Sequence, residues 1–152
     1  MMTEHSTEHA TFSIERSYAA SPARVFGAWA EPTAKARWFK GPGDWQRESY
    51  ELEFRVGGRE YLRIGPVGGA AHTFDCRYYD IIAGERIVYC YDMFIGDHRI
   101  SVSLATVEFT PAGSGTRMVF TEQAVFLDGY DDAGSRERGT EKLLDQLGAT
   151  LA

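Results

Sequence analysis

Helical patterns occur in only two places in this chain of 152 residues, and the long segment between them has the pattern of β-strands. The first helical segment begins at Ser21-Pro22 and ends at Trp38-Phe39, and the second covers Ser135–Leu151. Between them, as far as Phe126, apolar and polar residues alternate in short runs separated by turn residues. This pattern predicts a long antiparallel sheet with one helix to cover it, two layers that enclose a space.

Caps, prolines and alternation give the expected order of elements: one strand, two short helices, six further strands and a long helix. Ser21 is a good N-cap and Pro22 suits the first helical position, whereas Pro32 ends this helix and Thr33–Trp38 forms a second one. Gly57-Gly58 is expected as a hairpin turn. The strands are expected at Thr11–Ala19, Glu48–Val56, Arg59–Ile64, His72–Ile82, Glu85–Phe94, His98–Phe109 and Thr116–Phe126.

Length, charge and cysteine content limit the class of protein. We expect one domain over residues 11–152 and a disordered polar tail over residues 1–10. The formal net charge of −6 argues against nucleic acid and anionic membranes, since both bind basic surfaces. No apolar run reaches the about 18 residues of a membrane span. The tail does not resemble an export signal, so we expect Cys76 and Cys90 to be free thiols in the cytoplasm.

Several short segments carry a family resemblance through their order and spacing. They are Ser21–Phe26, Trp38-Phe39, Phe54–Gly58, Glu85–Tyr89, Thr106–Phe109, Phe120–Gln123 and Phe126–Gly129. Over Thr11–Leu151 the chain resembles the START-like (SRPBCC, helix-grip) superfamily, and within it the branch of the activator of Hsp90 ATPase C-terminal domain. The resemblance implies an α+β helix-grip fold, in which a curved antiparallel sheet of about seven strands surrounds a long C-terminal helix. It also implies a ligand cavity between the two.

Two departures from the family pattern limit what the resemblance implies. Many members carry a Gly-Trp pair where the last helix opens, whereas this helix opens through Ser135–Gly139. The chain as given also has no counterpart of the separate N-terminal domain of the eukaryotic co-chaperone. We therefore do not expect it to activate Hsp90, despite the name of the family.

The inward-facing positions of this fold are the candidate ligand-binding residues. Strand alternation nominates most of them, the end of the second short helix supplies two, and the apolar stripe of the last helix supplies two more. An apolar pocket with a few polar groups is the usual form of a small-molecule site, although the same residues can simply form the core. The candidates are Trp38, Phe39, Phe54, Tyr61, Phe74, Cys76, Tyr78, Tyr89, Tyr91, Phe120, Glu122, Phe126, Leu143 and Leu147.

The strand over residues 85–94 has two plausible registers. With Ala83-Gly84 as a two-residue loop, Ile82 pairs with Glu85 and Tyr78 faces Tyr89, and the inward residues are Ile87, Tyr89, Tyr91 and Met93. A slip of one residue turns the other face inward and sets Cys76 opposite Cys90. Its inward residues are Val88, Cys90 and Asp92. We prefer the first register, because it keeps Asp92 in water.

Glu122 is the polar candidate of most interest, because it shares its face with Phe120 and Phe126. A desolvated carboxyl group can act as a general base or accept hydrogen bonds from a ligand. Alternatively, it pairs with an arginine such as Arg59 or Arg63. The sequence has no Cys-x-x-Cys or His-Glu-x-x-His motif, so we expect no metal and no cofactor.

Three functions are compatible with these features. The first is the binding of a small hydrophobic or aromatic molecule, oriented by Glu122 and by Tyr78 or Tyr61. The second is a cyclase or dehydratase that uses Glu122 and tyrosines for acid–base chemistry. The third is a chaperone-related interaction module. A homodimer is also possible, through a strand edge or the region of Trp45.

Overall fold

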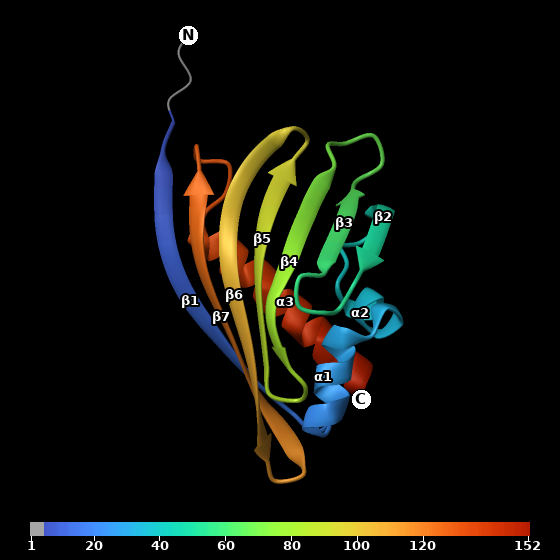
Figure 1. Ribbon diagram of the computed structural model, residues 1–152. Helices are drawn as coiled ribbons and strands as arrows, with labels where there is room; N and C mark the ends of the chain where they lie inside the picture. The colour runs from blue at the N-terminus through green and yellow to red at the C-terminus, as the bar shows by residue number, and fades with distance from the viewer. Residues whose placement is uncertain (1–4) are drawn as a thin grey trace.

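One curved seven-stranded antiparallel sheet wraps around a long helix in the computed structural model, which describes residues 5–152 (Figure 1). The strands are β1 (Thr7–Tyr18), β2 (Gln46–Leu52), β3 (Arg59–Gly65), β4 (His72–Ile82), β5 (Arg86–Ile95), β6 (His98–Ala112) and β7 (Gly115–Leu127). The helices are α1 (Pro22–Ala30), α2 (Pro32–Trp38) and α3 (Ala133–Leu151). The sheet order β1-β7-β6-β5-β4-β3-β2 is a meander from β2 to β7, with β1 added beside β7. The expected α+β helix-grip fold is therefore confirmed.

The two short helices begin and end where the sequence predicts. The Ser21 side chain accepts a hydrogen bond from the backbone N–H of Arg24 at 3.3 Å, and Pro22 occupies the first helical position. Pro32 forces Glu31 into an extended conformation, which ends α1 and lets α2 start at once. This abrupt connection brings Trp29 of α1 and Trp38 of α2 together, with ring centroids 4.8 Å apart.

The N-terminal strand starts earlier than the sequence predicts. Residues 7–10 pair with the end of β7, from Thr7 opposite Leu127, and the backbone N–H of Ser6 donates to Asp128 at 2.9 Å. The prediction of a disordered tail is therefore wrong for residues 7–10. These residues are exposed or half-buried on both faces, so they lack the alternation that reveals a strand. The part of the predicted tail over residues 1–4 lies outside the described residues.

The connection between β2 and β3 is longer than the predicted two-residue hairpin at Gly57-Gly58. Strand β2 ends at Leu52, and residues 53–58 form the turn. Gly57 has φ of 82°, and its N–H donates to the carbonyl of Tyr78, so the turn itself docks on β4. A Cβ atom at Gly58 would lie 2.1 Å from the carbonyl oxygen of Glu53, which explains the glycine there.

The β4–β5 hairpin has the preferred inward face, although its turn differs from the prediction. Ile82 pairs with Arg86 instead of Glu85, because the turn contains three residues. A bulge at Tyr79 compensates for the extra residue, so Tyr78 still faces Tyr89. The predicted inward residues Ile87, Tyr89 and Tyr91 are buried, and Met93 is half-buried. Cys76 and Cys90 lie opposite Tyr91 and Arg77 respectively, and both thiols are free.

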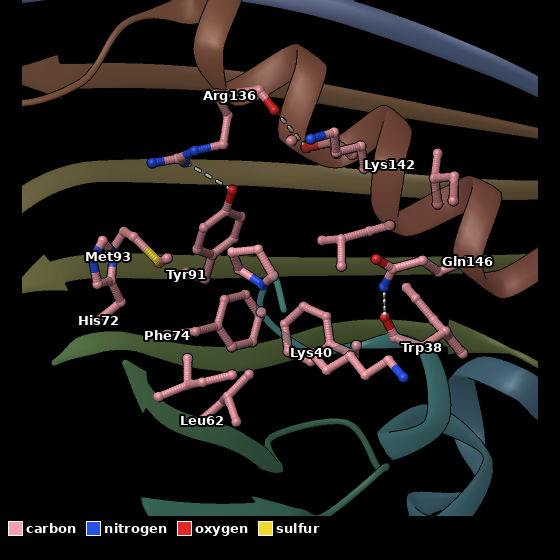
Figure 2. Close-up of a pocket in the computed structure, with 18 of the residues that line it drawn as sticks. Trp38, Lys40, Leu62, His72, Phe74, Tyr91, Met93, Arg136, Lys142 and Gln146 are labelled. Carbon is pink, nitrogen blue, oxygen red and sulfur yellow. Dashed lines mark hydrogen bonds between the residues drawn. The ribbon is translucent and has the colours of Figure 1, made fainter. Parts of the chain in front are cut away.

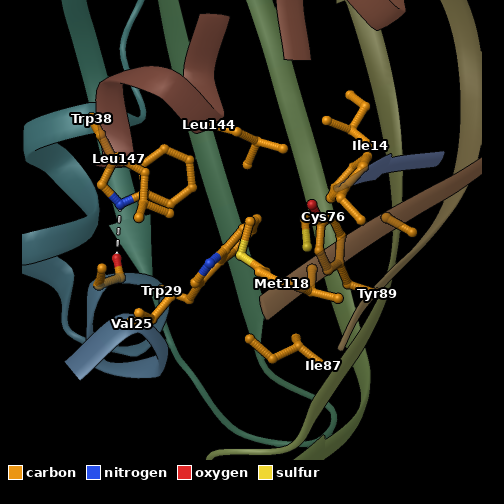
Figure 3. Packing of buried hydrophobic residues seen from close by; sticks show 14 of the residues in the cluster. Ile14, Val25, Trp29, Trp38, Cys76, Ile87, Tyr89, Met118, Leu144 and Leu147 are labelled. Carbon is orange, nitrogen blue, oxygen red and sulfur yellow. Dashed lines mark hydrogen bonds between the residues drawn. The ribbon is translucent and has the colours of Figure 1, made fainter. Parts of the chain in front are cut away.

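A cluster of buried hydrophobic residues forms where α1, α2 and the second half of α3 meet the sheet (Figure 3). Trp29 and Trp38 contact this cluster from the short helices, and Leu144 and Leu147 contact it from α3. Asp132 caps α3 by accepting a hydrogen bond from the N–H of Ser135 at 2.9 Å. The first half of α3 carries fewer apolar residues, and a cavity lies beside the helix from Ser135 to Gln146.

Candidate functional site

A cavity of about 400 Å³ lies between the sheet and α3 (Figure 2). Its volume is in the range of small-molecule sites in proteins. Strands β3, β4, β5 and β7 form one wall, α3 forms the other, and the segment after α2 borders the opening. The cavity thus lies where the family resemblance places a ligand.

The walls of the cavity are mainly aromatic and aliphatic. Phe74 lies centrally, with its ring centroid 4.9 Å from that of Phe39 and 4.7 Å from that of Tyr91. The other apolar lining residues are Trp29, Trp38, Pro42, Trp45, Leu62, Ile64, Tyr89, Met93, Phe120, Leu143 and Leu144. Rings held by neighbouring rings keep their positions, so the cavity is shaped before any ligand enters.

A buried cluster of polar side chains forms one part of the wall. The Tyr91 hydroxyl donates to both carboxylate oxygens of Glu122, at 3.0 and 2.9 Å, and Ser103 donates to Glu122 Oε2 at 2.8 Å. Arg136 Nη1 lies 3.3 Å from the same oxygen and donates to the Tyr91 hydroxyl at 2.9 Å. Arg136 Nη2 donates to Ser101 and to Asp131. Glu122 and Arg136 are therefore both engaged by protein partners.

The surroundings shift the pKa values of two members of this cluster, Tyr91 and Arg136. Burial raises the pKa of Tyr91 above its ordinary value, and the adjacent Glu122 raises it further, so the hydroxyl keeps its proton. Burial lowers the pKa of Arg136, but Tyr91, Glu122 and Asp131 together more than reverse this effect. The Glu122 carboxylate thus accepts hydrogen bonds from Tyr91, Ser103 and Arg136, which suits a fixed part of the wall better than a catalytic base.

The Tyr89 hydroxyl is a polar group of the cavity wall that stays available. The Tyr89 side chain lines the cavity and is 6% exposed, yet its hydroxyl has no hydrogen-bond partner among residues 5–152. Burial raises the pKa of Tyr89 well above the ordinary value, so the group is a hydrogen-bond donor at any physiological pH. By contrast, the hydroxyl of neighbouring Tyr78 donates to Glu60 at 2.6 Å.

The mouth of the cavity lies between α3 and the segment Lys40–Trp45. Gln146 on α3 donates to the carbonyl of Trp38 at 2.7 Å and so ties the two sides together. The Trp45 and His72 rings lie 4.6 Å apart at the rim. Burial lowers the pKa of His72, with a smaller opposing effect from Asp131, so the imidazole is neutral at pH 7.

Comparison with known proteins places the chain in a family. The family model described as "Activator of Hsp90 ATPase homolog 1-like protein" matches residues 19–152. The chain belongs to this family. No protein with a curated functional description matches it.

Solved structures of two relatives share the whole fold. An uncharacterized protein from Rhizobium leguminosarum is 50% identical, with 97% of each chain covered and a TM-score of 0.91. A protein from Rhizobium loti is 46% identical over 95% of this chain and 98% of that one, with a TM-score of 0.88. A third, from Chromobacterium violaceum, is 25% identical with a TM-score of 0.77, covering 92% of this chain and 95% of that one.

In this member of the Hsp90-activator-like family, eight of the predicted site residues line the cavity. They are Trp38, Phe39, Phe74, Tyr89, Tyr91, Phe120, Glu122 and Leu143. Five others contribute to packing behind or beside the lining: Phe54, Cys76, Tyr78, Phe126 and Leu147. Strand alternation selects a face of the sheet, but it does not say which part of that face the helices cover.

Tyr61 does not belong to the site, because it lies on the outer face of the sheet. Glu60, Leu62 and Ile64 are buried, so the alternate residues of β3 point outward. The guanidinium of Arg59 lies 4.5 Å from the centre of the Tyr61 ring. The same alternation places Arg59 and Arg63 on the outer face, where they pair with Asp75 and Glu48 respectively. The suggested pairing of either arginine with Glu122 is therefore wrong.

Sequence reasoning missed a second buried ion pair, between Lys35 of α2 and Glu60 of β3. Lys35 Nζ lies 2.9 Å from Glu60 Oε1, and the two residues are 2% and 0% exposed. Tyr50 and Tyr78 donate to the Glu60 carboxylate, and the ammonium group lies 4.7–5.4 Å from the ring centroids of Trp29, Trp38 and Phe39. Because Glu60 alternates in phase with Leu62, the sequence could have predicted that the Glu60 side chain faces inward, but it gave no such indication for Lys35.

The residues of the mouth were also missed, as were Trp29, Leu62, Ile64 and Arg136 of the walls. Arg136 lies in the first turns of α3, where a charged residue is unremarkable in a sequence. Its burial depends on the sheet curving over it, which no local pattern encodes.

Two further features bear on the kind of site. Among residues 5–152, no group of three or more His, Cys, Asp or Glu side chains is placed to hold a metal ion. No helix in the described part of the chain has both the length and the apolar character needed to cross a membrane.

Proposed function

We propose that this protein binds one small, largely apolar molecule in the cavity between the sheet and α3. The observation that carries the proposal is the aromatic-lined cavity of about 400 Å³ with an unpartnered hydroxyl, that of Tyr89, inside it. A collapsed core would leave neither the space nor the free donor.

Apolar contact provides most of the binding free energy. A ligand that loses roughly 300 Å² of apolar surface gains about 7 kcal/mol. A micromolar dissociation constant corresponds to about 8 kcal/mol, and association itself costs several kcal/mol of entropy. Apolar contact alone is therefore insufficient for tight binding, and polar anchors are needed.

Tyr89 is the anchor that we assign to the buried end of the ligand. Its hydroxyl would donate to a carbonyl or ether oxygen there, which replaces the Glu122 and Tyr78 interactions expected from the sequence. Both of those groups already have protein partners. For the same reason the cyclase alternative gains no support, because a general base must reach a substrate proton.

Binding is tested with N-phenyl-1-naphthylamine, a neutral probe whose fluorescence rises in apolar surroundings. We expect saturable binding of one probe per chain. Gly139 lines the cavity, and a Cβ atom there would meet nothing within 4 Å, so Gly139→Trp adds an indole ring beside the opening with no clash at the Cβ position. We expect this variant to lose binding and Gly139→Ala to keep it. Equal binding by all three proteins, or none by the wild type, contradicts the proposal.

The role of Tyr89 is tested by competition with two ring systems of similar size. Because one hydrogen bond contributes about 1 kcal/mol, Tyr89→Phe should weaken 2-acetonaphthone, which has a carbonyl acceptor, about five-fold. Naphthalene has no acceptor and should compete equally with both proteins. An equal effect on both competitors would show that the hydroxyl only shapes the wall.

A further inference from the structure

The mouth of the cavity carries two lysines that have no protein partner. Lys40 follows α2 and Lys142 lies on α3, and both are exposed residues that line the opening. Figure 2 shows them on opposing sides of the cavity, Lys142 along α3 and Lys40 beside Trp38. Within residues 5–152, neither ammonium group forms an ion pair or a side-chain hydrogen bond.

The charges that line the cavity are unbalanced in one direction. Three cations, Arg136, Lys40 and Lys142, face two carboxylates, those of Glu122 and Asp131. Both carboxylates are bound to Arg136, so the positive charge that remains lies at the mouth. This occurs in a protein whose formal net charge is −6, so the mouth differs in sign from the molecule as a whole.

We infer that the cavity's ligand carries one anionic group, such as a carboxylate or sulfonate, which lies in the mouth between Lys40 and Lys142 while its apolar part is buried. The inference rests on the proposed function and defines the class of ligand. An anion at this position keeps part of its hydration, which avoids the cost of burying a charge. An anion placed deeper would approach the Glu122 carboxylate, and a cation in the mouth would be repelled by both lysines.

The shape of the mouth fits the same ligand. Gly139 precedes Lys142 by three residues, so the two lie on one face of α3, and the glycine leaves the entrance open beside the lysine. The methylene groups of a lysine can cover an apolar rim while its ammonium group stays in water. The apolar part of the ligand and its anionic group thus meet different parts of the same two side chains.

Two probes that differ by one sulfonate separate the anionic preference from apolar binding. They are 8-anilinonaphthalene-1-sulfonate and N-phenyl-1-naphthylamine. We expect the wild type to bind the sulfonate more tightly and Lys40→Gln/Lys142→Gln to weaken it about five-fold, with the neutral probe unaffected. Raising the salt concentration from about 50 to about 500 mM should weaken only the sulfonate, because these charges are exposed to solvent.

A matched variant controls for net charge. Arg24→Gln/Arg77→Gln removes the same two charges from exposed positions that do not line the cavity, and it should leave both affinities unchanged. The inference is overturned if this control weakens the sulfonate as much as the lysine variant does. It is also overturned if the wild type binds both probes equally, a result that leaves the proposed function intact. If neither probe binds, or if Gly139→Trp binds both unchanged, the proposed function fails and the inference fails with it.

Discussion

The two buried ion pairs within residues 5–152 have similar chemistry and different surroundings. The Lys35–Glu60 pair joins α2 to β3, makes no part of the cavity lining, and is enclosed by three aromatic rings and two tyrosine hydroxyls. The Arg136–Glu122 pair joins α3 to β7 and borders the cavity. The Lys35–Glu60 pair therefore contributes to the fold alone, whereas the Arg136–Glu122 pair also shapes the cavity.

The pairs differ in how much each partner depends on the other. Lys35 has a single carboxylate, whereas Arg136 is shared between Glu122, Asp131, Ser101 and Tyr91. The loss of the carboxylate therefore leaves a buried cation without a counter-ion in the first pair only, because Arg136 keeps Asp131.

The largest effect is expected for Lys35→Met, which leaves the Glu60 carboxylate buried without a cation. We expect the free energy of unfolding to fall by about 3–5 kcal/mol, measured by urea denaturation. Lys35→Met/Glu60→Leu should recover part of the loss, because it removes the uncompensated charge. A loss below about 1 kcal/mol in the single variant would mean that water reaches this pair, and the contrast between the pairs would disappear.

A smaller effect is expected for Glu122→Gln, because Arg136 keeps Asp131 and Ser101. We expect a loss of about 1–3 kcal/mol in the same measurement, and little change in the binding of N-phenyl-1-naphthylamine. If Glu122→Gln costs more than Lys35→Met, the assignment of the two pairs is reversed. If it abolishes probe binding while the fold survives, Glu122 contacts the ligand directly.

The smallest effect on stability is expected for His72, at the rim of the cavity. Because burial lowers the pKa of folded His72 below its unfolded value near 6.5, the unfolded state binds the proton first. The associated stability is complete above about pH 6.5 and is lost as the pH falls through the folded pKa. We expect the melting temperature of the wild type to fall more than that of His72→Gln between about pH 7.5 and pH 5.5. Parallel curves would show that the imidazole is fully hydrated.

The fold could be predicted from the sequence because each helix and strand has its own pattern of caps, turns or alternating residues. The site could be predicted only where alternation shows which face of a strand points inward. Alternation along β7 placed Glu122 inside, and burial bears this out. The Tyr78–Tyr89 pairing was right although its turn was wrong, since the bulge at Tyr79 restored the register. The assignment of Tyr61 to the site was wrong, because it relied on the aromatic character of the residue. Glu60 and Leu62 share the inner face of β3, so Tyr61 between them points outward.

The partners of the buried charges were beyond sequence reasoning for a physical reason. Arg136 and Glu122 are 14 residues apart and meet only because the sheet curves over α3. Lys35 and Glu60 meet because the segment after α2 returns to the sheet as β2 and β3. In a sequence, a charged residue on a short helix such as Lys35 is taken to be exposed to solvent, because the layer that buries it is not known. For the same reason, the sequence did not indicate that Lys40 and Lys142 line the mouth of the cavity.

The position of β1 has a consequence for synthesis of the chain. Strands β2 to β7 are each neighbours of the next, so they can pair in the order in which they leave the ribosome. Strand β1 is made first but pairs only with β7, more than 90 residues later, as in Tyr18 opposite Thr116. Until then its inner face, with Phe12 and Ile14, has nothing to cover it. The slow step of folding should therefore be the joining of the first strand to the last, and the nascent chain is most prone to aggregate just before it.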